Sequence, residues 1–218
     1  MLLSGANAVV YGAGGVVGSS VASALARGGA RVHLVGRSRT RLDAVVRRIT
    51  DLGGQAEAQV LDVLDEVDVD EYVDVVAACS GSIDISVDLV GPTPVVEQPH
   101  QPHRRVDYTE LAELEGPVLG ALRSHFITAR AAARHMMCQH SGIILVPHRA
   151  AVTAGLDGAS LAAALLDRLA EQLAAQLAAS GVTVRAVDLE QGVEGDAADV
   201  GRRVVDAVTG GDPTLAAV

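Results

Sequence analysis

The sequence predicts one α/β domain built on a doubly wound parallel sheet. Short apolar runs alternate with longer stretches of helical periodicity along all 218 residues, which is typical of a sheet covered by helices on both faces. A glycine-rich stretch at 12–18 directly follows the first apolar run. The length suits a single hydrophobic core and no internal repeat divides it, so we expect residues 1–218 to form one domain.

The alternation assigns each strand and helix in turn. Apolar runs predict strands at 6–11, 31–36, 55–61, 83–90, 142–147 and 182–189. Helical spacing predicts helices at 16–28, 38–51, 66–80, 109–139, 159–179 and 197–209. Ser38 favours the start of the second helix, whereas Gly116-Pro117 predicts a bend or restart in the fourth. Right-handed crossovers between these strands give a Rossmann-like fold.

The composition limits the possible functions. A net charge of -10 argues against nucleic-acid binding, because neutralising phosphates needs clustered cations. Cys79 and Cys138 have no motif spacing and are expected to be buried, inert thiols. The first residues lack the basic segment of a signal peptide, and no apolar run is long enough to cross a bilayer. We therefore expect a soluble cytoplasmic protein.

The glycine-rich stretch predicts a nucleotide site because it lies between a strand and a helix. Gly12 permits a tight turn, and Gly14 or Gly15 lets the backbone approach a pyrophosphate. Gly18 lets the helix pack closely on the sheet. The amino end of that helix would offer free N–H groups to the phosphates. The alternative is a tight turn that binds nothing.

The end of the second strand favours NADP(H) as the cofactor. In a Rossmann fold this position meets the adenosine ribose, where an acid favours NAD and an arginine accommodates the 2′-phosphate of NADP. Arg37 stands there without an acid beside it, and Asp62 and Val63 follow the third strand where an adenine could be flanked. The alternative is that Arg37, Arg39 and Arg41 only decorate a solvated helix and that no cofactor binds.

Over nearly its whole length the sequence resembles the short-chain dehydrogenase/reductase (SDR) family. VYGAGGVVGSSVA resembles the glycine motif of the family's extended branch, and VGRSRTRLDAVVRRI resembles its NADP-dependent main branch. HFITARAAARHM is similar to the family's long central helix, and the motifs follow one another in the family's order. The resemblance implies a Rossmann fold that binds a dinucleotide. In that family an asparagine, a serine, a tyrosine and a lysine carry carbonyl reduction.

The catalytic positions depart from this pattern. Matched residue by residue, the family's asparagine falls on Ala121, its tyrosine on Ala159 and its lysine on Ala163. The window 146–149 holds no serine, and the sequence contains no lysine. The family's Asn-Asn-Ala-Gly is replaced by the residues DLVG at 88–91. In the family the tyrosine is the general acid and the lysine lowers its pKa. The resemblance therefore implies that the family's proton route is absent.

A histidine at the end of the fifth predicted strand is the candidate for a replacement chemistry. His148 lies where an open α/β sheet presents groups to its ligand crevice, and a neutral imidazole can donate or accept a proton there. Asp157 and Arg149 in the following loop could orient it or bind an anion, and Tyr108 and Glu190 are further candidates for the pocket. The alternative is an ordinary loop histidine. His100 and His103 have no third ligand in a predictable place, so we expect no metal site.

Three functions remain open. The first is a non-catalytic SDR-fold subunit that pairs with an active SDR subunit. The resemblance implies that helices 109–139 and 159–179 would form such an interface in a homo- or hetero-oligomer. The second is a repurposed non-redox enzyme, such as a cyclase, isomerase or dehydratase, that uses His148. The third is an atypical NADP-dependent oxidoreductase.

Overall fold

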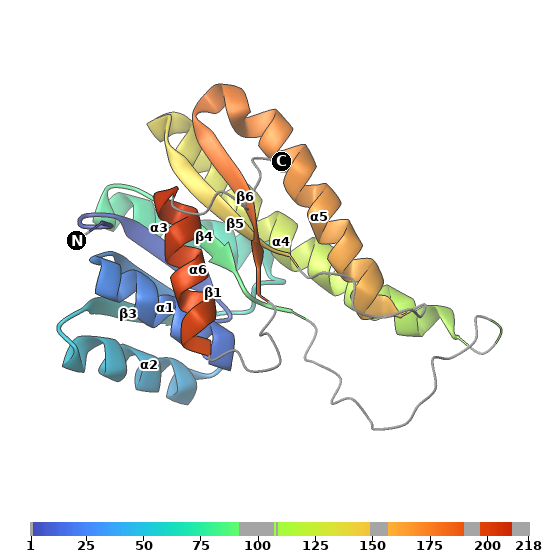
Figure 1. The fold of residues 1–218 in the computed structure, drawn as a ribbon, viewed down its shortest axis with the longest axis horizontal. Helices are drawn as coiled ribbons and strands as arrows, with labels where there is room; N and C mark the ends of the chain where they lie inside the picture. Colours follow the sequence, from blue (N-terminus) through green and yellow to red (C-terminus); the bar gives the residue numbers. More distant parts are fainter. Residues whose placement is uncertain (1, 92–106, 108, 149–156, 190–196, 211–218) are drawn as a thin grey trace.

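A six-stranded parallel sheet forms the centre of the computed structural model, which describes residues 2–91, 107, 109–148, 157–189 and 197–210 (Figure 1). The strands in this part of the chain are β1 (Asn7–Tyr11), β2 (Arg31–Gly36), β3 (Gln55–Val60), β4 (Ile85–Asp88), β5 (Gly142–His148) and β6 (Val182–Asp188). They pair in the order β3-β2-β1-β4-β5-β6, and every pairing is parallel. The predicted doubly wound, Rossmann-like sheet is confirmed.

Helices cover both faces of this sheet (Figure 1). The α-helices of the described residues are α1 (Val16–Gly28), α2 (Arg39–Asp51), α3 (Glu66–Ser80), α4 (Leu111–Gln139), α5 (Gly158–Leu177) and α6 (Ala197–Thr209). A short 3₁₀ turn, η2 (Ala178–Ser180), follows α5. The apolar core on one face involves α1, α2 and α6, and the core on the other involves α3, α4 and α5. The carboxyl ends of all strands therefore meet at one edge of a covered sheet.

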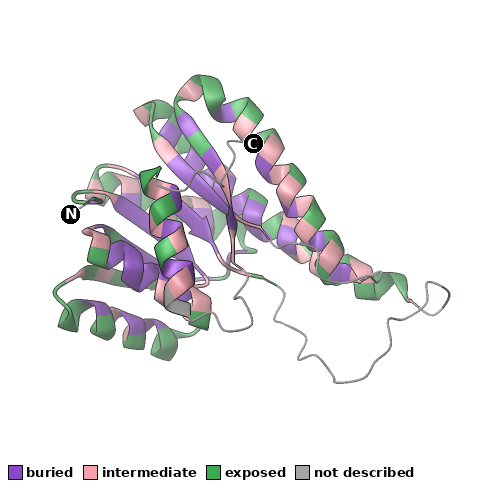
Figure 2. Ribbon diagram, viewed as in Figure 1, coloured by how far each residue is buried: buried purple, intermediate pink, exposed green. Residues whose placement is uncertain are grey.

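Aliphatic side chains make up nearly all of the core. Figure 2 shows buried residues along the central strands and on the sheet-facing sides of the helices. The largest fully buried side chains include Leu25, Leu34, Ile49 and Ile83, with Tyr11 as an aromatic exception. Burial of a Leu or Ile side chain stabilises the fold by about 1.5–3 kcal/mol. The core thus needs few aromatic residues, in agreement with an aromatic content of 2%.

Most predicted elements agree with the structure, but the predicted burial of the two cysteines was wrong. Of the predicted bend or restart at Gly116-Pro117, the restart does not occur: α4 continues through Pro117, since one missing N–H donor does not outweigh packing along its 29 residues. Cys79 and Cys138 are exposed rather than buried, because the last turns of α3 and α4 direct them away from the sheet. The predicted loop at 92–108 lies outside the described residues except for Asp107. No described helix is long and apolar enough to span a membrane.

The acidic segment around α3 contacts α4 rather than facing only solvent. Arg130 of α4 contacts both Glu66 and Asp70, and its Nη2 lies 2.6 Å from Asp70 Oδ2. Arg134 Nη2 lies 3.1 Å from Asp74 Oδ1. Such partly exposed pairs contribute about 1 kcal/mol or less each. These ion pairs hold α3 beside α4.

Candidate functional site

The turn after β1 needs glycine at two positions for steric reasons. Gly12 adopts φ +73°, and a Cβ there would approach the backbone of Leu89 to 3.0 Å. A Cβ on Gly18 would lie 2.2 Å from the carbonyl oxygen of Gly12, closer than atoms can pack. The first turn of α1 therefore sits directly against the loop, as the sequence predicted for a phosphate-binding turn.

The amino end of α1 is open to a ligand. Gly15 is its N-cap residue, and no side chain caps the helix there. The first turn of a helix has N–H groups without intrahelical partners, and the helix dipole adds positive potential at this end. A phosphate fits such a site without further cations. The absence of a capping side chain leaves these donors to a ligand or to water.

A cavity of about 590 Å³ opens from this turn along the carboxyl ends of the strands. The glycine loop forms one wall, and residues after β2, β3 and β4 form the others. Part of α4, including Gly120, Ala121 and Ser124, closes it on the side of β4. Ligands of open α/β sheets bind at this edge, and the cavity has the size of a small-molecule or cofactor site.

All the predicted cofactor residues except Gly18 line this cavity. Arg37 and Arg41 are exposed side chains on its wall, and neither forms an ion pair with another described residue. A Cβ on Gly14 would come within 3.1 Å of the Arg41 side chain, so Arg41 lies over the glycine loop. Arg39 instead pairs with Asp43 at 2.9 Å and is absent from the lining. Two unpaired guanidinium groups thus face the cavity beside the phosphate turn.

Asp62 and Val63 form the wall after β3. The Asp62 carboxylate accepts a hydrogen bond of 3.1 Å from the backbone N–H of Leu64, which holds the turn. Val63 is buried. The sequence predicted that these two residues flank an adenine. Leu61 and Leu42 add apolar surface to the same wall.

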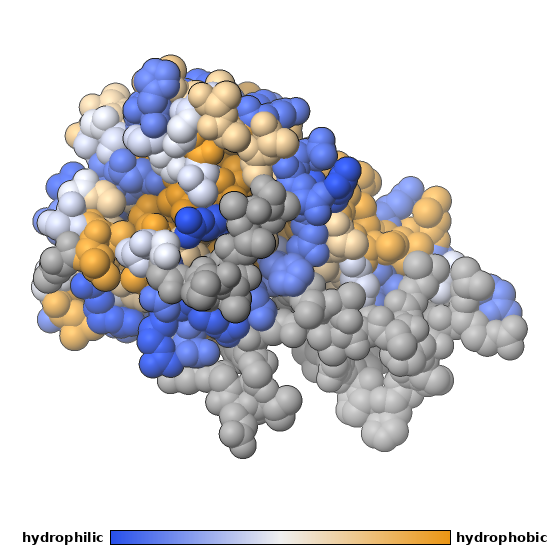
Figure 3. Space-filling view, turned by 45° about the horizontal axis from the view of Figure 1, so that its top comes forward, coloured by the Kyte–Doolittle hydropathy of each residue, from blue (hydrophilic) through white to orange (hydrophobic). Residues whose placement is uncertain are grey.

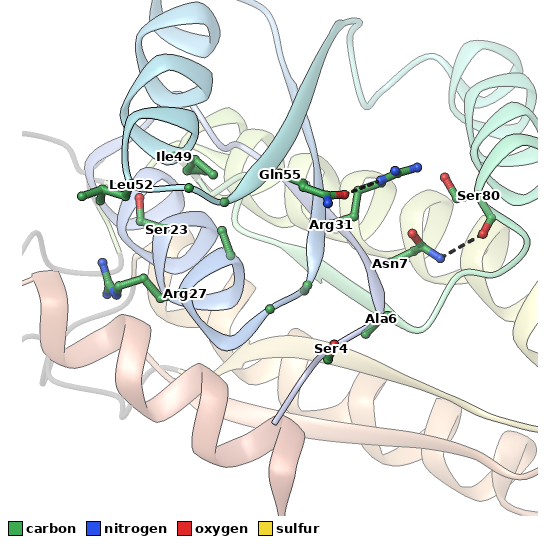
Figure 4. Close-up of a pocket in the computed structure, with 16 residues that line it drawn as sticks. Ser4, Ala6, Asn7, Ser23, Arg27, Arg31, Ile49, Leu52, Gln55 and Ser80 are labelled. Atoms are coloured by element: carbon green, nitrogen blue, oxygen red, sulfur yellow. Dashed lines mark hydrogen bonds between the residues drawn. The ribbon is translucent and has the colours of Figure 1, made fainter. Parts of the chain in front are cut away.

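A second cavity lies at the opposite edge of the sheet. It has a volume of about 580 Å³ and is lined by the residues that begin β1, β2 and β3 (Figure 4). Two of its polar side chains are partnered: Arg31 donates to Gln55 at 3.2 Å, and Asn7 donates to the Ser80 carbonyl at 3.3 Å. Helix carboxyl ends, not amino ends, point toward this edge, which disfavours a phosphate. We do not assign a ligand to it.

A buried polar cluster lies directly behind the cavity wall at the end of β4. The Asp88 Oδ2 accepts hydrogen bonds from Ser124 Oγ at 2.5 Å, His125 Nδ1 at 2.7 Å and Thr128 Oγ1 at 3.3 Å. Its Oδ1 accepts the backbone N–H of Val90 at 2.8 Å. The four side chains of this Asp88 cluster are buried. The sequence had marked Asp88 only as a departure from the family, and the cluster itself was missed.

Charge stabilises this cluster despite its burial. Burial raises the pKa of Asp88, but the neighbouring His125 and the hydrogen bonds from His125 and Ser124 outweigh it, so the pKa lies below its ordinary value. Tyr11 is the neighbour of Asp88 across the sheet register. Burial first, and then the Asp88 charge, raise the pKa of the Tyr11 hydroxyl well above its ordinary value. That hydroxyl has no hydrogen-bond partner among the described residues.

Of the three alanines that the resemblance matches to the family's catalytic positions, one lines the cavity. Ala121 is buried and lines it. Ala159 is exposed and Ala163 half-buried, both on α5. The start of α5 packs on α4, because a Cβ on Gly158 would lie 2.7 Å from the ring of Pro117, a residue of the cavity wall. None of the three alanines can carry a proton.

His148 ends β5 and pairs with a residue that the sequence did not suggest. Its Nδ1 lies 2.6 Å from Asp167 Oδ1 on α5. Asp157 is the N-cap of α5 and accepts the N–H groups of Ala159 and Ser160, each at 2.9 Å. Orientation of His148 therefore comes from Asp167, and Asp157 caps the helix. The remaining candidates, His100, His103, Tyr108, Arg149 and Glu190, lie outside the described residues.

Comparison with known proteins places the chain among dehydrogenases. The family described as short chain dehydrogenase matches residues 6–192. Gluconate 5-dehydrogenase of Gluconobacter oxydans is 33% identical over 148 residues, which cover 66% of this chain and 53% of that protein. The oxidoreductase UxuB of Bacillus subtilis is 35% identical over 89 residues, 41% of this chain and 32% of that protein. The matched part thus spans about half or less of these relatives.

Solved structures agree over the whole domain. A metagenomic short-chain oxidoreductase in complex with NADP has a TM-score of 0.83 and 26% identity, with 100% of this chain and 96% of that one covered. A short chain dehydrogenase of Burkholderia cenocepacia J2315, also in complex with NADP, has a TM-score of 0.74 and 28% identity, with 95% and 92% covered. Since the family match extends over residues 6–192, the chain belongs to the short-chain dehydrogenase family.

Proposed function

We propose that this chain is an NADP(H)-binding member of its family that does not use the family's tyrosine–lysine proton route. The observation that carries the proposal is the cavity at the strand ends, which combines the glycine turn with Arg37 and Arg41. Structural relatives in complex with NADP support the choice of dinucleotide. NADP(H), when bound, supplies or accepts a hydride at its nicotinamide ring.

The residues present fit such a dinucleotide. The uncapped first turn of α1 would bind the pyrophosphate, since Gly12 and Gly18 leave no room for a Cβ between loop and helix. Arg37 and Arg41 would bind the 2′-phosphate, because a planar guanidinium can donate two hydrogen bonds to one phosphate. Val63 and the Asp62 turn would lie against the adenine.

The proton side of the family's reaction has no equivalent at Ala159 and Ala163. A general acid contributes about 10²–10⁴ in rate, and an alanine cannot replace it. We therefore propose that the isolated chain does not reduce carbonyls by the family's route. Its role in that reaction would be that of a non-catalytic subunit, or pseudoenzyme, paired with an active SDR subunit.

The surface of α4 and α5 supports a role in assembly. Large apolar side chains are exposed there, among them Leu119, Phe126 and Met137 of α4 and Leu161 of α5. Figure 3 shows hydrophobic side chains gathered on the part of the molecule that these two helices form. Burying such a surface against another chain would be favourable by about 25 cal/mol per Å². Phe126→Asp is expected to lower the oligomeric mass in analytical ultracentrifugation. Leu52→Asp, at the C-cap of α2 and also exposed, is expected to leave the mass unchanged.

The cofactor proposal is tested by calorimetric titration with NADPH and, separately, NADH. Loss of one charged hydrogen bond costs about 1.5–3 kcal/mol, so Arg37→Ala or Arg41→Ala should weaken NADPH binding about tenfold or more and leave NADH binding nearly unchanged. Arg47→Ala is the control, because Arg47 lies on α2 like Arg41 but does not line the cavity. No binding of either nucleotide would overturn the cofactor assignment. Carbonyl-dependent NADPH oxidation by the isolated chain would overturn the proposed loss of catalysis.

A second candidate function is a non-redox enzyme, such as a cyclase, isomerase or dehydratase. The specific observation in its favour is the hydrogen bond between His148 and Asp167.

A further inference from the structure

The His148–Asp167 pair leaves one imidazole nitrogen available. Nδ1 of His148 lies 2.6 Å from Asp167 Oδ1, and because a carboxylate only accepts, Nδ1 must be the protonated nitrogen. In the neutral ring the lone pair then resides on Nε2. Nε2 has no hydrogen-bond partner among the described residues. The side chains are 39% and 38% exposed, so a small molecule can reach the ring.

The pair lies at the same edge of the sheet as the cavity of the proposed nucleotide site. Strand β5 pairs in parallel with β4, as Leu145 with Val87, and ends at His148. The chain that follows β4 supplies Leu89 and Val90 to the cavity wall. On the other side, β6 places Asp188 beside His148, and Arg203 approaches Asp188 to 3.5 Å.

Helix α5 sets Asp167 on the same face as the two alanines at the family's catalytic positions. Asp167 follows Ala163 by four residues, and Ala163 follows Ala159 by four, so the three share one face of the helix. Both alanine side chains are short, and Ala159 is exposed whereas Ala163 is half-buried. We expect a ligand at this edge of the sheet to meet the imidazole on the face of α5 where the resemblance places the family's hydroxyl and ammonium groups.

We propose that His148 and Asp167 form an acid–base pair that moves a proton on a small carbonyl compound without hydride transfer. The Nε2 lone pair takes a proton from a carbon next to the carbonyl, the C–H bond breaks and its electrons form the enolate. Asp167 stabilises the imidazolium and holds the ring, and Nε2 returns the proton to the same carbon on either face, so the C–H bond forms again and the carbonyl is restored. No electrons leave the substrate, so the step needs no oxidant. This activity goes beyond nucleotide binding and does not require it.

A second histidine–carboxylate pair provides a matched control. His135 Nε2 lies 2.7 Å from Asp74 Oδ1 across α3 and α4, away from the strand ends. It has the same partner type and similar exposure, at 25% and 49% for the two side chains. A purely structural pair at His148 would behave like His135.

The orienting role of Asp167 is tested by the tautomer of His148. Long-range ¹H–¹⁵N correlation spectra of the seven histidines should show His148 protonated at Nδ1 in the wild type. Asp167→Ala should shift it to the Nε2–H form, and Asp167→Glu should restore the original signature. An unchanged spectrum in Asp167→Ala would overturn the assignment of Asp167.

The acid–base role of His148 is tested with 5-nitrobenzisoxazole, whose ring opens when a base removes its C–H proton. The electrons of the broken C–H bond form the nitrile, the N–O bond breaks, and the product is a coloured phenolate. The rate of colour formation therefore reports general-base strength directly. The wild type should exceed His148→Gln by about 10²-fold, Asp167→Ala should lose most of this rate, and His135→Gln should retain it. Melting temperatures verify that each variant is folded. Equal rates for the wild type and His148→Gln would overturn the proposal, whatever the outcome of the nucleotide titrations.

Discussion

Replacement of Asp88 by alanine should destabilise the fold strongly, because this one carboxylate accepts four hydrogen bonds in the interior. Thr128 retains a second acceptor, the Ser124 carbonyl at 3.0 Å, and the Ser124 hydroxyl can rotate. The His125 Nδ1–H and the Val90 N–H have no other acceptor among the described residues. Each buried donor left unsatisfied costs about 1–3 kcal/mol.

The His125 and Val90 donors, which lose their acceptor, set the expected loss of unfolding free energy. Two unsatisfied donors give about 2–6 kcal/mol, and breaking a buried ion pair by removing one partner costs about 3–5 kcal/mol. We expect Asp88→Ala to lose about 3–5 kcal/mol of unfolding free energy, which corresponds to a fall in Tm of roughly 6–20 °C for a domain of this size. Asp88→Asn keeps one acceptor oxygen and should lose less, about 1–3 kcal/mol.

Urea unfolding monitored by circular dichroism measures this loss, with Asp43→Ala as the control. Asp43 forms an exposed pair with Arg39 at 2.9 Å, so its removal should change stability by about 1 kcal/mol or less. The folded pKa of Asp88 lies below its ordinary value of 3.8, so its contribution is complete above that pH and is lost as the pH falls through the folded pKa. An Asp88→Ala variant within 1 kcal/mol of the wild type at pH 7 would refute the reasoning.

Three further predictions concern substitutions of single residues. Gly18→Ala should weaken NADPH binding and lower Tm, because its Cβ would lie 2.2 Å from the Gly12 carbonyl oxygen; unaltered titration and melting curves would contradict this. Burial, opposed by the nearby Glu57, lowers the pKa of His33 from 6.5. The stability of the wild type should therefore fall as the pH drops below 6.5. In urea titrations His33→Leu should show a smaller fall between pH 7.5 and 5.5. Tyr11→Phe should be neutral or stabilising in the same titrations, because the Tyr11 hydroxyl is buried without a partner; a loss above 2 kcal/mol would show a missed interaction.

Local sequence patterns were sufficient to predict the fold and the glycine turn of the candidate nucleotide site. The helices α1, α3 and α6 have the predicted bounds, because the glycines and acidic residues at their ends act within one turn. The glycine turn could be interpreted from spacing alone, since steric contact between Gly12 and Gly18 involves residues six apart. In α5 leucines recur every four residues, but Leu161 is exposed whereas Leu173 and Leu177 are buried, because a helix of 3.6 residues per turn rotates such a stripe relative to the sheet.

Pairs between distant residues could not be predicted in this way. Asp88 and His125 are 37 residues apart, and His148 and Asp167 are 19 apart. Only sheet order and helix docking bring them together. One signal was present: Ser124 and Thr128 share a face of α4 whose other residues are apolar, which indicates a buried polar partner. Asp157 was the nearer carboxylate in the sequence, but its place just before Gly158 is that of an N-cap.

The Asp88 cluster and the His148–Asp167 pair differ in how many of their polar atoms already have hydrogen-bond partners, and this difference indicates different roles. Every oxygen of Asp88 already accepts a hydrogen bond inside the protein, so a ligand could gain contact with it only by breaking one of them. A fully satisfied buried network rigidifies its surroundings, and here it fixes Val90 and Ser124 in the cavity wall. His148 has one nitrogen held and one without a described partner, at a half-exposed position. Proton transfer needs such a group, so substrates for this chain should be sought among molecules that reach His148.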